Sequence, residues 1–230
     1  MGIRSLIRKH PLVQLTLLCA VLITWTGVYF HQPFLRMLPL YISLYVGTLQ
    51  SRASRYAPLV GSINSLVYTL VYIGLGLYAN ALFAFLVSFP MQLATFFLWK
   101  KRAYKNSVRF RSLKPLHWIL VLGGFAIAFT AMNLILNSMG GSYRFWDSTV
   151  SLLGILVTLL QMLAFREYSW LMLLSGSSNI AMNCAMLPQH PGQITFVIYA
   201  SHAFICIVLQ FFRVQKLVKE QKSTNAETKE

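Results

Sequence analysis

Long apolar runs separated by short polar turns constrain the fold of this chain more than any other feature of its sequence. An α-helix of about 20 mostly apolar residues crosses the hydrocarbon core of a bilayer, where open strand edges would leave backbone groups without hydrogen-bond partners. The runs therefore predict an all-α membrane protein of about eight transmembrane helices. The predicted spans are 12–30, 34–51, 57–74, 78–99, 116–137, 146–165, 168–187 and 193–212.

Composition agrees with a membrane protein and argues against a nucleic-acid-binding protein. Hydrophobic residues make up 57% of the chain and charged residues only 11%, which is far from the balance of a soluble domain. The net charge is +15, but the cations lie between the apolar runs instead of covering a water-facing surface. We expect a lipid bilayer around the chain and no nucleic-acid partner.

The basic residues predict the orientation of the helices, because cytoplasmic turns carry the excess of lysine and arginine. With eight spans and a cytoplasmic N-terminus, all but two of the 20 lysine and arginine residues fall on the cytoplasmic side. The exceptions, Arg36 and Arg144, lie beside span ends, where a long side chain reaches the polar interface. We expect a multi-pass protein of a bacterial inner (plasma) membrane with both termini in the cytoplasm.

A short motif occurs twice and predicts an internal duplication. The sequence Gly-Ser-Ile-Asn at 61–64, in the third span, returns 115 residues later as Gly-Ser-Ser-Asn at 176–179, in the seventh span. Four crossings separate the copies, so both run in the same direction, as in a parallel repeat of three helices each. The alternative is that small residues recur because they permit close helix contacts in lipid.

The duplication divides the chain into five segments around a core of three, one and three helices. The tail after Phe212 is polar and mixed in charge, and we expect it to be frayed. The segments are 1–33 (N-terminal cytoplasmic end and an extra transmembrane helix), 34–99 (first three-helix repeat), 100–145 (basic cytoplasmic loop and linker helix), 146–212 (second three-helix repeat) and 213–230 (cytoplasmic tail).

Polar side chains in or beside the predicted spans are the candidate binding residues, since such groups are costly in lipid and normally face a partner or a wet cavity. Asn179 and Asn183 lie one turn apart on one helix face, and Gln92 follows a proline that kinks helices. For each candidate the alternative is a structural hydrogen bond between helices. The candidate substrate-binding residues are Asn64, Tyr68, Gln92, Trp146, Asp147, Trp170, Ser177, Asn179 and Asn183.

The sequence contains no motif of a catalytic or metal-binding site. It lacks a Gly-rich phosphate loop, a His-Glu-x-x-His pair and a Gly-x-Ser-x-Gly turn, and its three cysteines are not spaced as metal ligands. We expect no enzyme activity, no cofactor and no metal. No acidic residue lies at the middle of a span, and His202 is interpreted as a packed residue. A facilitator is therefore favoured over a proton-coupled pump.

An ordered set of motifs extends over most of the chain. It comprises Gly61-x-x-Asn64, Leu77-Tyr78-Ala79, Phe89-Pro90-Met91-Gln92, the stretch 96–101, and Phe145-Trp146-Asp147-Ser148 followed by Arg166-Glu167. From about residue 34 to 212 the chain resembles the PnuC-type vitamin transporters, whose best-known members take up nicotinamide riboside. The resemblance implies a SWEET-like architecture, facilitated diffusion, and a cytoplasmic kinase that traps the cargo.

One motif of that family is not kept. Members that carry nicotinamide riboside have a Trp-x-x-Trp motif and an asparagine four residues later. Counting from Asp147 without gaps places Ser169, Met172 and Gly176 at these three positions. Trp170 is displaced from the first of them by one residue. We expect a vitamin or nucleoside-like cargo, with nicotinamide riboside and thiamine both open. The rival interpretation is a non-transporting membrane scaffold or assembly protein, and the sequence leaves a homo-oligomer open.

Overall fold

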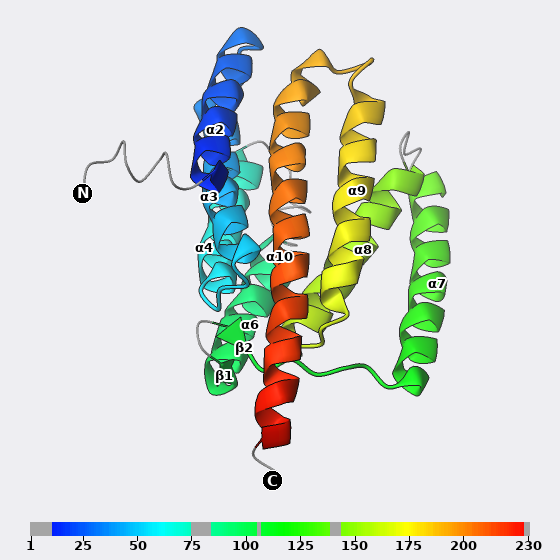
Figure 1. Cartoon of the computed structure of the whole chain (residues 1–230). Coiled ribbons are helices and arrows are strands. Elements are labelled where there is room, and N and C mark those ends of the chain that lie inside the picture. Colours follow the sequence, from blue (N-terminus) through cyan, green and yellow to red (C-terminus); the bar gives the residue numbers. More distant parts are fainter. Residues whose placement is uncertain (1–10, 75–83, 105–106, 139–143, 228–230) are drawn as a thin grey trace, which may run out of the picture.

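The computed structural model of the chain describes residues 11–74, 84–104, 107–138 and 144–227 (Figure 1). These residues form eight α-helices, a π-helical turn η1 (Ala84–Ser88) before the fourth of them, and a 3-10 turn η2 (Pro191–Gln193) before the last. The α-helices are α2 (Pro11–Tyr29), α3 (Phe34–Ser51), α4 (Ala57–Gly74), α6 (Phe89–Lys101), α7 (Pro115–Ser138), α8 (Arg144–Met162), α9 (Tyr168–Met186) and α10 (Ile194–Glu227).

The helices confirm the predicted all-α fold, and most of their bounds lie within a few residues of the predicted spans. In the fourth predicted span, residues 78–83 lie outside the described residues. Among the described residues, three stretches are long and apolar enough to cross a membrane, namely Pro11–Tyr29, Pro115–Leu134 and Pro191–Gln221. Helices α4 and α8 contain shorter apolar stretches.

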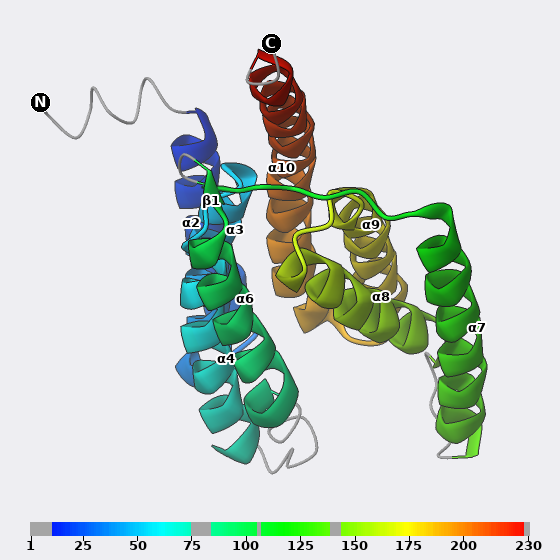
Figure 2. The ribbon, with the colours of Figure 1, turned by 90° about the horizontal axis from the view of Figure 1, so that it is seen from below.

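The helices pack as two groups of three, and two further helices, α2 and α7, lie outside the groups. Helices α3, α4 and α6 form the first group and α8, α9 and α10 the second, and the groups meet where α3 packs on α10 and α6 packs on α8. Helix α2 packs against α3 and α10, whereas α7 packs against α8. Viewed from below, α2 and α7 stand on opposite sides of the molecule (Figure 2).

A buried cluster joins the two groups at the end of the molecule where the basic loop lies. The Trp99 indole N–H donates a hydrogen bond of 2.7 Å to the Gln161 carbonyl, and its ring meets those of Phe110 and Tyr168 edge-on. The cluster therefore ties the end of α6 to the α8–α9 turn. It also contains Ala53, Val108, Val157, Leu160, Ala164, Val214, Leu217 and Val218.

The basic loop after α6 folds onto this cluster. Strands β1 (Ala103–Tyr104) and β2 (Ser107–Val108) form an antiparallel hairpin. The Gln221 side chain of α10 donates to the Val108 carbonyl at 2.9 Å and accepts a bond of 3.0 Å from the Phe110 N–H. The loop is thus held by side-chain bonds from the far end of the last helix.

The residues after Phe212 differ from the expected frayed tail, and that prediction was wrong for the segment up to Gln221. Helix α10 continues to Glu227 and projects beyond the other helices (Figure 1). Val214, Leu217 and Val218 are buried in the cluster, and their spacing of three and four residues places them on one helix face. This apolar face stabilises the last part of the helix, although most other residues after Phe212 are polar.

The cluster predicts a large difference between two tryptophan substitutions. Trp99 is 1% exposed and Trp25 is 67% exposed. We expect Trp99→Ala to lower the free energy of unfolding by about 3 kcal/mol, because a large buried side chain is lost and a cavity remains. The control variant Trp25→Ala should change it little. Thermal unfolding of the purified protein in detergent measures both, and equal midpoints would contradict the assignment.

Candidate functional site

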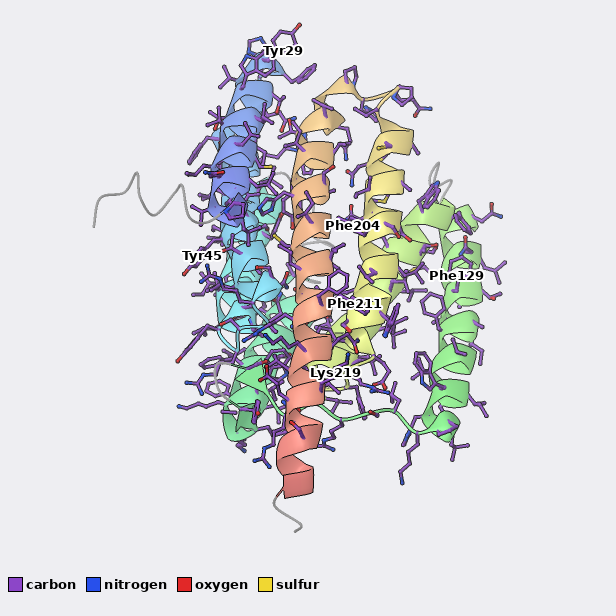
Figure 3. All side chains as sticks on the ribbon, viewed as in Figure 1. Tyr29, Tyr45, Phe129, Phe204, Phe211 and Lys219 are labelled. Atoms are coloured by element: carbon purple, nitrogen blue, oxygen red, sulfur yellow. The ribbon has the colours of Figure 1, made fainter. Side chains whose placement is uncertain are left out.

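A cavity of about 270 Å³ lies between the two groups of helices, and all six helices of the groups contribute to its wall. Its position at the junction of the groups means that any movement of one group against the other reshapes it. In Figure 3, Phe204 reaches from α10 toward α9, beside the cavity. The polar and aromatic side chains of the wall are Gln50, Gln92, Thr95, Thr158, Gln161, Ser175, Asn179, Tyr199 and Phe204.

Amides and hydroxyls make up the polar part of the wall, and no lysine, arginine, aspartate or glutamate occurs among its described residues. A side-chain amide both donates and accepts hydrogen bonds, so this wall suits an uncharged polar solute. Within the described part of the chain, the side chains of Gln50, Gln161 and Ser175 make no hydrogen bond, which leaves them available to a ligand. Tyr199 and Phe204 offer aromatic faces to a ring.

Gln92 is oriented by two serines. Its Nε2 atom donates to the Oγ atoms of Ser65, at 2.9 Å, and Ser88, at 3.1 Å, and the two hydroxyls lie 2.9 Å apart. A β-carbon added at Gly61 would overlap the Gln92 side-chain oxygen. Gly61, the first residue of the repeated motif, therefore permits the close approach of α4 and α6 that positions this amide.

The second copy of the motif makes a similar contact. A β-carbon added at Gly176 would lie 2.9 Å from Ile207 Cδ1 and 3.0 Å from the Phe204 ring of α10. Gln92 and Ile207 are separated by 115 residues, as are Gly61 and Gly176. The same offset thus relates both the glycines and the residues that they face.

The two predicted asparagines of α9 lie in different places. Asn179 lines the cavity. Asn183 is buried and does not line it; its Nδ2 atom donates to the Asn179 Oδ1 atom at 2.6 Å, and its Oδ1 atom accepts a bond of 2.7 Å from Gln193. Asn183 therefore holds Asn179 in position and ties α9 to the turn before α10.

Asn64 lies behind the cavity wall. Its Nδ2 atom donates to the Ser43 hydroxyl at 2.8 Å, and Ser43 in turn contacts Tyr199 of the wall. The Asn64 Oδ1 atom is buried without a hydrogen-bond partner in the described residues. Tyr68, one turn further along α4, is half-buried and also lies outside the wall.

Four further candidates from the sequence are not brought together at the cavity. Trp170 is 59% exposed and packs edge-on against Phe211, with the ring centroids 4.4 Å apart. Ser177 is exposed, and Trp146 is half-buried away from the wall. Asp147 lies at the start of α8, and its side chain falls outside the described part of the structure.

Several wall residues are absent from the candidates chosen from the sequence. Gln161 lies inside a predicted span and Gln50 near the end of another, so both meet the criterion of a polar residue in or beside a span, although neither was chosen as a candidate. The sequence does not mark Tyr199 and Phe204 as binding residues, because an aromatic residue in an apolar helix is typical of ordinary packing. His202 lies on another face of α10, with Nε2 3.0 Å from the Thr16 hydroxyl of α2.

Comparisons with known proteins agree with this geometry. The family model described as Nicotinamide mononucleotide transporter matches residues 33–214. The crystal structure of the vitamin B3 transporter PnuC is similar at a TM-score of 0.71 and 18% sequence identity, over 92% of this chain and 93% of that one. At this identity the similarity shows a shared fold. The search of curated proteins found no match.

The contact at Gly61 predicts opposite effects for two glycine substitutions. Gly61→Ala displaces the Gln92 amide from its serine partners, and we expect the free energy of unfolding to fall by about 1 kcal/mol. In the control Gly123→Ala, on α7, the added carbon meets nothing within 4 Å, so the better helix propensity of alanine should preserve or raise stability. Thermal unfolding in detergent compares them, and shifts in the same direction would refute the prediction.

Proposed function

The chain belongs to the nicotinamide mononucleotide transporter family, and on that premise we propose that it carries a vitamin or nucleoside-like solute across a membrane by facilitated diffusion. The observation that carries the proposal is the cavity of about 270 Å³ between two groups of three helices. Amides surround it for hydrogen bonding, and two aromatic rings lie beside them for stacking on a planar ligand.

The charge of the wall supports a cargo without a phosphate group. A phosphate monoester carries about two negative charges and is normally bound by arginine or lysine. Neither residue occurs in the described wall. The proposed cargo is therefore a dephosphorylated compound, such as nicotinamide riboside or thiamine, and not a nucleotide.

The wall also bears on the choice between these two compounds. Met172 and Gly176 line the cavity at the positions where a gapless count places a tryptophan and an asparagine in related nicotinamide riboside carriers. In this chain the Met172 thioether stands in place of the tryptophan ring, and Gly176, which has no side chain, stands in place of the asparagine amide. Trp170 packs outside the wall. This difference supports testing thiamine alongside nicotinamide riboside.

Transport requires the cavity to open to each side in turn. The cluster around Trp99 closes the bundle at the end that carries the basic loop, and rocking of one helix group against the other would open it. No carboxylate or histidine lies in the described wall, which supports passive transport over proton coupling. A cytoplasmic kinase that modifies the cargo would then maintain net uptake.

The proposed division into repeats 34–99 and 146–212 is supported by the pattern of helix contacts. The helices of the two groups correspond in order, α3 to α8, α4 to α9 and α6 to α10. Under this correspondence, the α3–α4, α4–α6 and α3–α10 contacts match the α8–α9, α9–α10 and α8–α6 contacts. The contacts of Gly61 and Gly176 add a counterpart at the level of single residues. In this division α2 is the extra helix and α7 the linker.

The first test measures uptake into liposomes that contain the full-length protein. We expect labelled thiamine or nicotinamide riboside to enter faster than in protein-free vesicles. Asn179→Ala should lower the initial rate about fivefold, because one hydrogen bond to the cargo is lost. Ser177→Ala, on an exposed position of the same helix, is the matched control and should transport normally.

Two results of the uptake assay would count against the proposal. If no vitamin or nucleoside enters faster than in empty vesicles, the protein is better explained as a non-transporting scaffold. If Asn179→Ala and Ser177→Ala transport equally well, Asn179 does not belong to the site.

A second test concerns orientation, which we propose from the distribution of basic residues. Cys19 and Cys206 are buried and Cys184 is exposed, so Cys184→Ser provides a background for labelling. In intact cells a membrane-impermeant maleimide should react with His190→Cys, in the turn before α10. It should reach Lys101→Cys, at the end of α6, only after the cells are permeabilised. Labelling of Lys101→Cys in intact cells would contradict the proposed orientation and indicate the opposite one.

A further inference from the structure

A second pocket, of about 400 Å³, lies where the start of α2, the end of α3 and the middle of α10 meet. It shares no residue with the cavity between the helix groups. The pocket residues of α10 are Leu209, Phe212, Arg213 and Lys216, and their spacing places them on the helix face opposite the one that carries Phe204. We call this the α2–α3–α10 pocket.

Three cations converge on this pocket without an anionic partner. Arg52 caps the C-terminal end of α3, and Arg213 and Lys216 lie three residues apart on α10. In the described part of the chain none of the three forms an ion pair or a side-chain hydrogen bond. Glu220, one turn beyond Lys216, is not part of the pocket lining. Like charges gathered in this way attract an anion.

Apart from Ser51, the rest of the pocket lining is apolar, and the pocket opens to the outside of the bundle. Leu12 and Val13 of α2 form one wall, and Leu209 and Phe212 of α10 form the other. Leu209 is 43% exposed and Phe212 is 65% exposed, so both side chains face the lipid. A ligand that fills this pocket therefore combines an anionic group with an adjacent hydrocarbon portion.

The spans predicted from the sequence place the pocket at the level of the lipid headgroups. Three spans predicted from the sequence begin or end beside it, at residues 12, 51 and 212. The ten residues before Pro11 cannot neutralise it, because they include Arg4, Arg8 and Lys9 and no acidic residue. The surrounding membrane, in contrast, supplies molecules that combine a phosphate with acyl chains.

We propose that the α2–α3–α10 pocket binds an anionic phospholipid. Its phosphate lies between Arg52, Arg213 and Lys216, and its acyl chains follow the apolar walls. The lipid bridges α2, which lies outside the two helix groups, to a helix of each group. Because the pocket is separate from the cavity, this inference does not depend on which solute the protein carries.

Native mass spectrometry of the full-length protein tests the proposal, with phosphatidylglycerol and phosphatidylcholine of identical acyl chains as probes. Phosphatidylglycerol should bind at least about tenfold more tightly. The triple variant Arg52→Gln, Arg213→Gln, Lys216→Gln should remove at least about tenfold of that affinity, since each cation contributes to binding an anionic headgroup. Equal binding of the two lipids would overturn the proposal.

Two further variants distinguish lipid binding in the pocket from general electrostatic attraction of anionic lipid to the basic end of the molecule. Lys100→Gln, Lys101→Gln, Arg109→Gln removes three exposed cations from the same end and should retain phosphatidylglycerol binding. Leu209→Trp fills the apolar floor without changing charge and should weaken binding, so it tests the pocket even if the triple variant does not fold. An equal loss in the two charge variants would overturn the proposal, as would displacement of the lipid by millimolar inorganic phosphate.

Discussion

The structure depends on one constraint: a polar group inside a bilayer must find a partner within the protein or line a space that holds water or cargo. The backbone satisfies this constraint by forming helices. The side chains satisfy it in small closed sets, such as Gln92 with Ser65 and Ser88, and Asn183 with Asn179 and Gln193. The side-chain amides of Gln50 and Gln161, which make no hydrogen bond within the described part of the chain, line the cavity. The polar residues of the interior are thus divided between holding helices together and receiving a solute.

The helices within each group pack closely, and the cavity lies at the junction between the groups. Glycines at 61 and 176 let the second and third helices of each group approach closely, and such small residues are the usual means of helix association in lipid. Between the groups the wall includes Gly154, where an added β-carbon would meet nothing within 4 Å. Glycine therefore permits close helix contacts at residues 61 and 176, whereas at residue 154 it leaves space in the cavity wall.

The sequence predicted the helices well, because the length of an apolar run and the turns around it depend on the chain alone. It predicted less about which way each helix faces. Trp170 and Met172 are two residues apart, about 200° around a helix, and only the packing of α9 on α10 decides that the methionine reaches the cavity. The end of α10 was missed for a related reason. Val214, Leu217 and Val218 are scattered among polar residues, and their role depends on the cluster that covers them.

The length of α10 links two distant parts of the molecule mechanically. Phe204 lies at the cavity, and Gln221 holds the backbone of the hairpin that follows α6. Seventeen residues of helix between them form a stiff lever of about 25 Å, so a tilt of about 5° at the cavity would displace the far end by about 2 Å. That is enough to break a pair of hydrogen bonds. A solute that displaces α10 at Phe204 would therefore release the loop held by Gln221 without contacting it.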